Sequence, residues 1–409
     1  MLIRYVVRPM GRLQWVLVRR VVSPMKRALA RDIGPSPTQT RVYDAFFRSE
    51  SGYSKRALLL YLASAMALPP ESARFTVHQN YRGCRFIASI LDELGYIVDV
   101  GFARDLEHSP PHEYDLLVSD KGDDRQVRPT LRHGAKTIFL ATTLEHRRHN
   151  ANIKMRHERL QTRRGCTVEV RRKYAHTLPF AARVDAIAGF GNDFIMSTWQ
   201  PVNPGPRLPF NNFSHREVPR ASAKKNFEAA RRNFLFFASA SQIQKGLDLL
   251  LEIFPRHPEL HLYVCSNYLN EPDFCACYKK ELQHTPNIHG LGRIQITGRT
   301  FRDLVDRCAY VIGPTASDGQ SGAVVNCMAA GLIPVVTREA GIDTAEFGVM
   351  LADDTLEEIE RVVVELAGHP PEWHARRATL TQEVASREYS EEAFVARWRA
   401  IIREVTGDQ

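Results

Sequence analysis

The stretch SDGQSGAVVNCMAAGLIPVV, residues 317–336, decides the fold class of this chain. Its first residues are polar and include two glycines, its middle is apolar, and its last residues form a β-branched run typical of a buried strand. A polar loop at a helix N-terminus is either a tight connection or an anion cradle, in which backbone N–H groups and the positive helix end hold a phosphate. The stretch alone leaves both interpretations open.

Strand-like and helix-like segments alternate on both sides of this stretch. Upstream, strands are predicted at 57–65, 96–103, 114–120 and 136–142, with a helix at 85–96. Nearer to the stretch, strands at 234–240, 261–266, 287–292 and 309–314 alternate with helices at 246–254, 274–283 and 301–308. Such alternation predicts parallel sheets covered by helices on both faces. The predicted fold class is therefore α/β, with two Rossmann-like doubly wound domains and a ligand site in the cleft beyond the carboxyl ends of their strands.

Prolines and a terminal apolar face suggest where the domains end. Residues 201–212 contain four prolines, a density that predicts no regular element and hence a boundary. The predicted terminal helix has one apolar face, made of Phe394, Val395, Trp398, Ile401, Ile402 and Val405. We therefore predict an N-terminal extension and linker over 1–54, a first domain over 55–212, a second domain over 213–388 and a C-terminal helix over 389–409.

The charge of the chain favours an anionic partner. The 409 residues are 44% hydrophobic and 25% charged, with a formal net charge of +9 at pH 7, so nucleic acid, an acidic membrane surface and a phosphorylated substrate are all candidates. Residues 147–173 are rich in Arg and Lys, which indicates either a solvated helix face or a surface for anionic lipid or a lipid-diphosphate acceptor. Apart from Tyr174, aromatic residues that could stack on bases are missing near this run, so we do not expect nucleic acid as a partner.

Residues 1–31 combine apolar residues with regularly spaced arginines. Arg4, Arg8 and Arg12 lie on one side of a helical projection and apolar residues on another, as in helices that bind anionic membranes. A leader helix packed on the following domain fits equally well. The charges exclude a secretory signal, and no run of about 18 apolar residues predicts a membrane span. We therefore expect a cytoplasmic protein that contacts the inner face of the cell membrane peripherally.

The seven cysteines predict neither a disulfide framework nor a metal site. Their number is odd and their spacing is scattered, and the close pair Cys275 and Cys277 lacks the second pair that a zinc site needs. We expect reduced thiols, most of them in the core, and no bound metal.

Two polar loops directly follow strands of the second domain. The first, ASASQIQKG, ends on Lys245 and Gly246, and the second contains Gly319, Ser321 and Gly322. Both lie at strand carboxyl ends, so the lysine charge and the helix N–H groups could hold a diphosphate between them. The alternatives are a solvated lysine at a helix end and turn glycines that need a positive φ.

KGLDLLLEIF, SDGQSGAVVNCMAAGLIPVVT and AGID resemble the C-terminal domain of retaining, nucleotide-sugar-dependent glycosyltransferases of the GT-B fold, group 1 or family 4 type. KTIFLATTLEHRRHNANIKMRHERLQTRRG and DAIAGFGNDFIMSTW are similar to matching segments of bacterial transferases of polysaccharide and surface-glycan biosynthesis. The resemblance covers roughly residues 55–405. It implies C-terminal helices that return to the first domain, and a sugar transfer from a nucleotide-diphosphate donor to a glycan or lipid-linked acceptor with retention and without cofactor or metal.

The resemblance also implies roles for single residues. The family's two acidic positions fall on Asp318, which would face the donor sugar, and on Asn326, which would contact the ribose. The lysine of its diphosphate pair falls on Lys245, but the arginine falls on Ala240. A histidine near the reacting sugar falls on His146, with His149 as second choice.

The expected catalytic residues are thus Asp318, His146 and Lys245. The expected donor-binding residues are Ser239, Lys245, Gly246, Gly319, Gln320, Ser321, Gly322, Ala323 and Asn326. For Asp318 a structural role as a helix cap remains the alternative. Because Ala240 and Asn326 depart from the family pattern, a non-catalytic scaffold that binds a nucleotide sugar or a partner transferase is the rival function.

Overall fold

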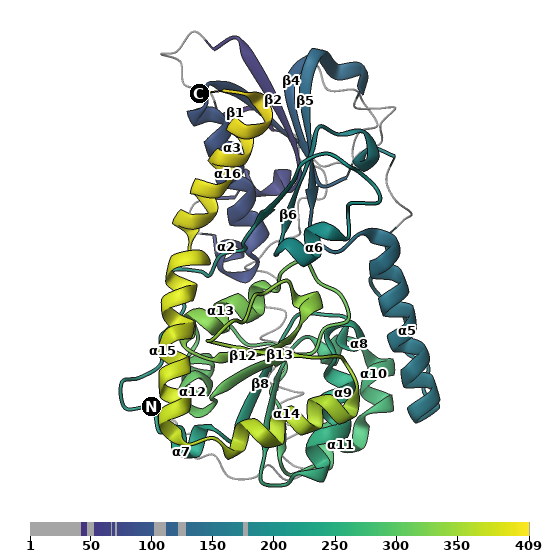
Figure 1. Cartoon of the computed structure of the whole chain (residues 1–409), viewed down its shortest axis with the longest axis vertical. Helices are drawn as coiled ribbons and strands as arrows, with labels where there is room; N and C mark the ends of the chain where they lie inside the picture. Colours follow the sequence, from purple (N-terminus) through teal and green to yellow (C-terminus); the bar gives the residue numbers. More distant parts are fainter. Residues whose placement is uncertain are drawn as a thin grey trace.

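The computed structural model describes residues 42–46, 53–66, 68–69, 72–101, 112–121, 128–174 and 179–408 (Figure 1). The predictions for residues 1–31 lie outside these ranges. Within them, no helix combines the length and the apolar character needed to cross a membrane.

The first sheet has six parallel strands and one antiparallel edge strand. Its order is β1-β3-β2-β4-β5-β6-β7, and β1 pairs antiparallel with β3. The strands are β1 (Val42–Phe46), β2 (Lys55–Leu60), β3 (Tyr96–Gly101), β4 (Tyr114–Ser119), β5 (Leu131–Ala141), β6 (Ala186–Phe190) and β7 (Arg207–Phe210). The helices are α2 (Arg74–Val77), α3 (Gln79–Glu93), α5 (His146–Arg164) and α6 (Asp193–Ser197). Within the described residues, the strands predicted at 96–103, 114–120 and 136–142 and the helix predicted at 85–96 are confirmed as β3, β4, β5 and α3. The strand predicted at 57–65 is too long, because β2 ends at Leu60 and residues 63–65 form a 3₁₀ turn.

The prediction of no regular element over 201–212 is wrong, because β7 lies there despite its prolines. It pairs with β6 at the edge of the sheet, where Pro209 stands opposite Gly189. An edge strand needs ladder hydrogen bonds on one side only, so a residue without an N–H group is tolerated.

The second sheet is entirely parallel, in the order β10-β9-β8-β11-β12-β13. Its strands are β8 (Asn233–Phe237), β9 (His261–Cys265), β10 (Ile288–Gly290), β11 (Tyr310–Gly313), β12 (Ile333–Thr337) and β13 (Val349–Leu351). Its helices are α7 (Phe227–Ala230), α8 (Gln242–Lys245), α9 (Leu247–Ile253), α10 (Pro272–Cys277), α11 (Lys279–His284), α12 (Arg299–Arg307), α13 (Gly322–Ala330), α14 (Leu356–Gly368) and α15 (Pro371–Glu388). The single helix predicted over 274–283 is two helices, since Tyr278 leaves helical geometry while its buried ring packs in the core and its hydroxyl donates to Glu252.

The last helix, α16 (Glu391–Thr406), returns to the first domain, as Figure 1 shows. Its Phe394, Trp398, Ile401 and Ile402 belong to the same buried cluster as residues of α3 and the first sheet. The predicted apolar face of this helix is therefore an interface between domains. The fold is α/β, with two Rossmann-like domains and a C-terminal helix that returns to the first domain, as predicted.

Helix α5 leaves its own sheet and lies along the second domain, beside α8, α9 and α10 (Figure 1). We call residues 146–174 the interdomain arm. Its buried positions recur every three or four residues, and Leu160 and Val168 belong to the core of the second domain. Five of its arginines, Arg156, Arg159, Arg163, Arg164 and Arg171, pair with carboxylates of the second domain. Half of the ten Arg and Lys residues of the basic run are thus neither a solvated face nor a lipid surface, because their charges are neutralised within the molecule.

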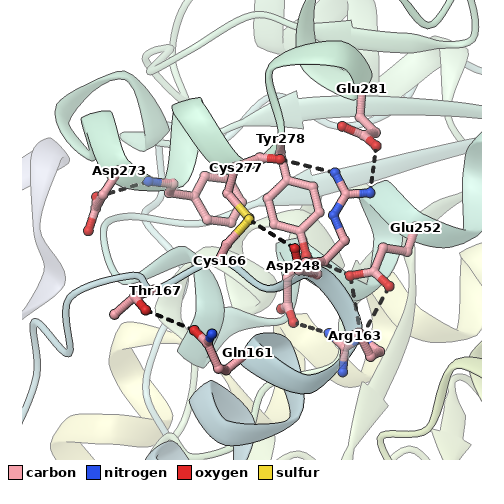
Figure 2. The surroundings of a disulfide bond; sticks show 12 residues. Gln161, Arg163, Cys166, Thr167, Asp248, Glu252, Asp273, Cys277, Tyr278 and Glu281 are labelled. Carbon is pink, nitrogen blue, oxygen red and sulfur yellow. Dashed lines mark hydrogen bonds and ion pairs between the residues drawn. A yellow bond between two sulfur atoms is a disulfide. The ribbon is translucent and has the colours of Figure 1, made fainter.

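The prediction that all cysteines are reduced is wrong for two of them. Cys166 in the arm and Cys277 at the end of α10 form a disulfide (Figure 2). Cys84, Cys265, Cys308 and Cys327 are free and buried, as expected, and Cys275 is free and half-buried. The spacing along the chain could not indicate the pair, because 111 residues separate its members and only the path of the arm brings them together.

Candidate active site

The side chains of Lys245 and Asp318 form an ion pair between the two polar loops of the second domain. Their exposed fractions are only 8% and 9%. Gly246 makes this approach possible: its φ is +83°, and a Cβ on it would lie 2.4 Å from the carbonyl oxygen of Pro314. A side chain here would push the loop after β8 away from the loop after β11. The structure therefore brings together the two residues expected to act on opposite ends of the bond to be broken.

Asp318 is not the cap of α13, so that alternative is wrong. The N-cap is Ser321, whose hydroxyl accepts from the N–H of Val324. One carboxylate oxygen of Asp318 accepts from the N–H of Gly319 at 3.1 Å, and the other contacts Lys245. Burial alone would raise the pKa of Asp318, but the charges of Lys245 and Arg172 and these hydrogen bonds hold it below its ordinary value. Asp318 is therefore a carboxylate at neutral pH.

His149 connects the first domain to the loop that carries Asp318. Its Nδ1 lies 2.8 Å from Oγ of Ser317 and 3.2 Å from Oγ1 of Thr143, and its Nε2 lies 3.3 Å from the carbonyl oxygen of Arg172. Burial lowers the pKa of His149 to about 4, so the ring is neutral at pH 7. Because a carbonyl can only accept, Nε2 carries the proton and Nδ1 accepts from a hydroxyl.

His146, the first choice from sequence, lies in an aromatic enclosure. Its ring stacks on Tyr174 with centroids 4.3 Å apart, and it meets Phe139 and Trp199 edge-on. Burial lowers the pKa of His146 to about 4 as well. In this arrangement Tyr174 covers His146, whereas His149 contacts the residue next to Asp318.

Gly319 and Gly322 allow close contact with the first domain. Neither has a positive φ, so the turn-glycine alternative is wrong. A Cβ on Gly319 would lie 2.6 Å from the carbonyl oxygen of Thr142, and one on Gly322 would lie 2.0 Å from Oε1 of Gln79. The Gln79 amide also donates to the carbonyl of Gly322 at 3.1 Å. The first turn of α13 thus faces Gln79 directly.

Asn326 and Gln320 bind the segment between the domains. Oδ1 of Asn326 accepts from the N–H of His215 at 2.9 Å. The Gln320 amide donates to Oδ1 of Asn211 at 2.9 Å and accepts from the N–H of Asn212 at 2.6 Å. Gln320 therefore binds the last residues of the first domain, whereas Asn326 binds the first residues of the second domain, and its Oδ1 is already engaged there.

The remaining expected donor residues, Ser239 and Ala323, lie in the loop after β8 and in the first turn of α13. Ser239 is exposed at the carboxyl end of β8, and its carbonyl accepts from the side chain of Gln242 at 2.9 Å. Ala323 is half-buried in the first turn of α13.

Sequence reasoning missed Arg172, Ser317 and Gln244. The Gln244 amide donates to the carbonyl of Ser317 at 2.6 Å, and the charge of Arg172 acts on Asp318. Ser317 opens the stretch quoted first and Arg172 lies in the basic run, but nothing in their spacing indicates that the arm reaches the second domain.

Comparisons with known proteins agree with this architecture. Residues 231–369 match the family described as Glycosyl transferases group 1. The sucrose-phosphate synthase of Thermosynechococcus elongatus superposes with a TM-score of 0.60 at 11% identity, over 87% of this chain and 100% of that chain. HepE of Anabaena, solved in complex with UDP-glucose, superposes with a TM-score of 0.55 at 11% identity, over 85% and 99% of the two chains.

Other matches cover less. TarM of S. aureus superposes with a TM-score of 0.48 at 11% identity, over 70% of this chain, which spans 55% of the TarM chain. No curated protein matches at the sequence level. The chain thus has the GT-B fold, and its second domain contains the segment that matches the group 1 glycosyl transferases.

Proposed function

We propose that this protein is a glycosyltransferase that moves a sugar from a nucleotide-diphosphate donor to a glycan or lipid-linked acceptor, with retention at the sugar carbon. The observation that carries the proposal is the buried Lys245–Asp318 pair at the carboxyl ends of β8 and β11, in the segment that matches the group 1 family. A cation and a carboxylate side by side can stabilise the opposite charges that form when a glycosyl–phosphate bond breaks.

Breaking a glycosyl–phosphate bond creates negative charge on the leaving diphosphate and positive charge on the sugar carbon. Lys245, once it turns from Asp318 to the donor, would stabilise the diphosphate, aided by the N–H groups at the start of α13. Asp318 would stabilise the sugar carbon. The acceptor hydroxyl oxygen forms the new bond, and its proton passes to an oxygen of the departing phosphate.

Removing the charge of Lys245 should weaken binding of a nucleoside diphosphate and leave the nucleoside unaffected. For Lys245→Ala we expect at least a roughly tenfold rise in the Kd for UDP or GDP, because a charge-assisted contact with phosphate is lost. Titration calorimetry with each diphosphate and its nucleoside measures both affinities.

The exposed Lys224→Ala serves as control for this experiment. Because Lys245→Ala leaves Asp318 buried without its partner, Lys245→Gln is the second variant, since it keeps the side-chain length and a donor. An equal loss of affinity for diphosphate and nucleoside would remove Lys245 from the phosphate contact.

A non-catalytic scaffold is the second candidate. It is favoured by Asn326, which is engaged with His215, and by Ala240, which provides no charge beside the loop after β8. A donor-hydrolysis screen across nucleotide sugars separates the two, because a transferase hydrolyses its donor slowly without acceptor, whereas a scaffold only binds it.

We expect the transfer to need no metal ion. The sequence has no Asp-x-Asp pair beside a donor loop, and in the ranges that the structure describes no three His, Cys, Asp or Glu side chains converge on one point. Turnover of the donor identified in that screen should therefore persist in excess EDTA. An absolute need for Mn²⁺ or Mg²⁺ would contradict the proposed mechanism.

The biological setting is also proposed. A role in bacterial surface-polysaccharide synthesis and a cytoplasmic place at the inner membrane face rest on the sequence resemblance and on residues 1–31. Co-sedimentation of the chain with anionic vesicles, with and without residues 1–31, tests the membrane contact.

A further inference from the structure

A single covalent bond joins the interdomain arm to the second domain. Cys166 follows directly after α5, where Gly165 ends the helix with a φ of +66°, and Cys277 ends α10 (Figure 2). Both cysteines are half-buried, so a small dithiol in solution can reach the bond.

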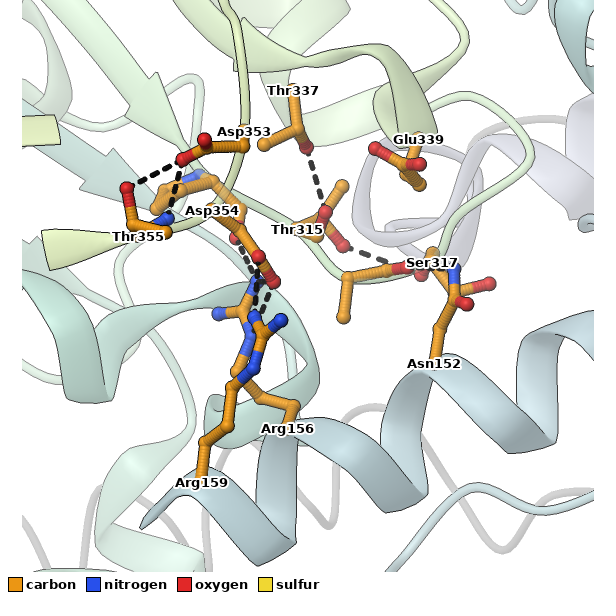
Figure 3. A network of polar contacts seen from close by, with 12 residues as sticks. Asn152, Arg156, Arg159, Thr315, Ser317, Thr337, Glu339, Asp353, Asp354 and Thr355 are labelled. Atoms are coloured by element: carbon orange, nitrogen blue, oxygen red, sulfur yellow. Dashed lines mark hydrogen bonds and ion pairs between the residues drawn. The ribbon is translucent and has the colours of Figure 1, made fainter. Parts of the chain in front are cut away.

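The helical half of the arm binds the loop that carries Asp318. The Asn152 amide donates to the carbonyl of Ala316 at 2.9 Å, and the Arg156 guanidinium donates to the carbonyl of Pro314 at 2.9 Å and pairs with Asp354 at 2.8 Å (Figure 3). The two carbonyl groups, of Ala316 and Pro314, lie two and four residues before Asp318 in the chain. A movement of the arm would therefore shift the loop that carries Asp318 and so disturb the Lys245–Asp318 pair.

The other half of the arm runs from the disulfide to His146. The N–H of Glu169 donates to Asp273 at 2.8 Å, and Arg171 pairs with the same carboxylate. At the end of the arm, the backbone of Tyr174 exchanges two hydrogen bonds with the side chain of Asn150, at 2.8 and 3.0 Å. The disulfide thus anchors one end of a segment whose other end covers His146.

The two domains are in contact beside the candidate donor site. His149 of the arm contacts Ser317, Gly319 lies against Thr142, and Gly322 faces Gln79. Lys245 and Asp318 are only 8% and 9% exposed and pair with each other. A nucleotide sugar therefore reaches both side chains only when the contacts around them separate.

We propose that the Cys166–Cys277 disulfide is a redox latch: while intact it holds the arm on the second domain and keeps the donor site closed, and its reduction permits opening. A dithiol reductant supplies the chemistry. Its thiolate attacks one cysteine sulfur and displaces the other as a thiolate, and its second thiol then resolves the mixed disulfide, so that two electrons and two protons pass to the cysteines. Without the disulfide, the ion pairs of the arm form and break freely. The covalent bond keeps the paired side chains close together and so raises their effective concentration. That the admitted ligand is a nucleotide sugar depends on the proposed function.

The test compares oxidised and dithiothreitol-reduced protein by hydrogen exchange and by stopped-flow binding of UDP and GDP. After reduction, amides of residues 153–174 should exchange roughly tenfold faster, because the arm opens more often. Nucleotide association should accelerate about threefold or more, because a larger fraction of the molecules is open. Cys166→Ser and Cys277→Ser should match the reduced protein under both conditions. Cys275→Ser, which removes the free cysteine two residues away, should keep the response to reductant.

Three results would overturn the latch. One is peptide mapping of oxidised protein that finds Cys166 and Cys277 as free thiols. Another is identical exchange of the arm in both redox states, and the third is identical nucleotide association rates. If exchange responds to reductant but neither form binds any nucleoside diphosphate, the latch of the arm stands and the proposed function fails.

Discussion

Replacing Arg156 by alanine should lower the free energy of unfolding by about 3–5 kcal/mol, the cost of leaving a buried charge without its partner. Its guanidinium is 1% exposed, pairs with Asp354 and lies 3.8 Å from Asp248, which is fully buried. Burial already raises the pKa of Asp248 against the nearby Arg156 and Arg163. Removing one of these two cations leaves the carboxylate less compensated and the carbonyl of Pro314 without its donor.

Arg159→Ala is the matched control for this prediction. It removes the same kind of side chain from the same helix and the same partner, since Arg159 lies 2.6 Å from the other oxygen of Asp354. Its side chain is 42% exposed, so water screens the pair, and we expect a loss below about 1 kcal/mol. Urea unfolding with the disulfide intact measures both variants. Equal losses of unfolding free energy in Arg156→Ala and Arg159→Ala would contradict the prediction that the buried ion pair contributes more than the exposed one.

Asp318→Asn should reduce turnover at least tenfold, which corresponds to a barrier higher by about 1.4 kcal/mol or more. Asparagine keeps an oxygen that can accept from the N–H of Gly319 and removes only the charge. Because positive charge develops on the sugar during transfer, the loss should appear in kcat more than in nucleotide affinity. Donor hydrolysis and transfer rates at saturating donor measure it.

The variant also places Lys245 opposite a neutral amide in a buried position, so we expect some loss of stability and compare turnover where both proteins are folded. The pKa of Asp318 is lowered in the folded protein, so its negative charge stabilises the fold. This stabilisation is present at pH values above the ordinary carboxyl pKa and is lost as the pH falls through the lowered pKa. Asp353→Asn, at an exposed position outside the site, is the control. Unchanged turnover in Asp318→Asn would favour the scaffold over the enzyme.

The sequence by itself determined the elements and the edge of the sheet at which the candidate site lies. Alternating apolar runs specify buried parallel strands because the pattern is local, and the apolar face of α16 is visible in the spacing of Phe394, Trp398 and Ile401. Parallel strands direct their carboxyl ends to one edge of the sheet, so the sequence predicts that the loops bearing Lys245 and Asp318 lie at the same edge. In the structure the two side chains pair there.

Only the tertiary structure decided what these elements bind. The basic run of the arm and the carboxylates of the second domain are far apart in sequence, and a charged helix face has the same pattern whether it meets water, lipid or protein. The same holds for Cys166 and Cys277, and for Gly319 and Gly322, whose missing side chains admit the first domain. The physical reason is that secondary structure follows from the local periodicity of side chains, whereas pairing depends on which surfaces the folded chain brings within a few ångströms.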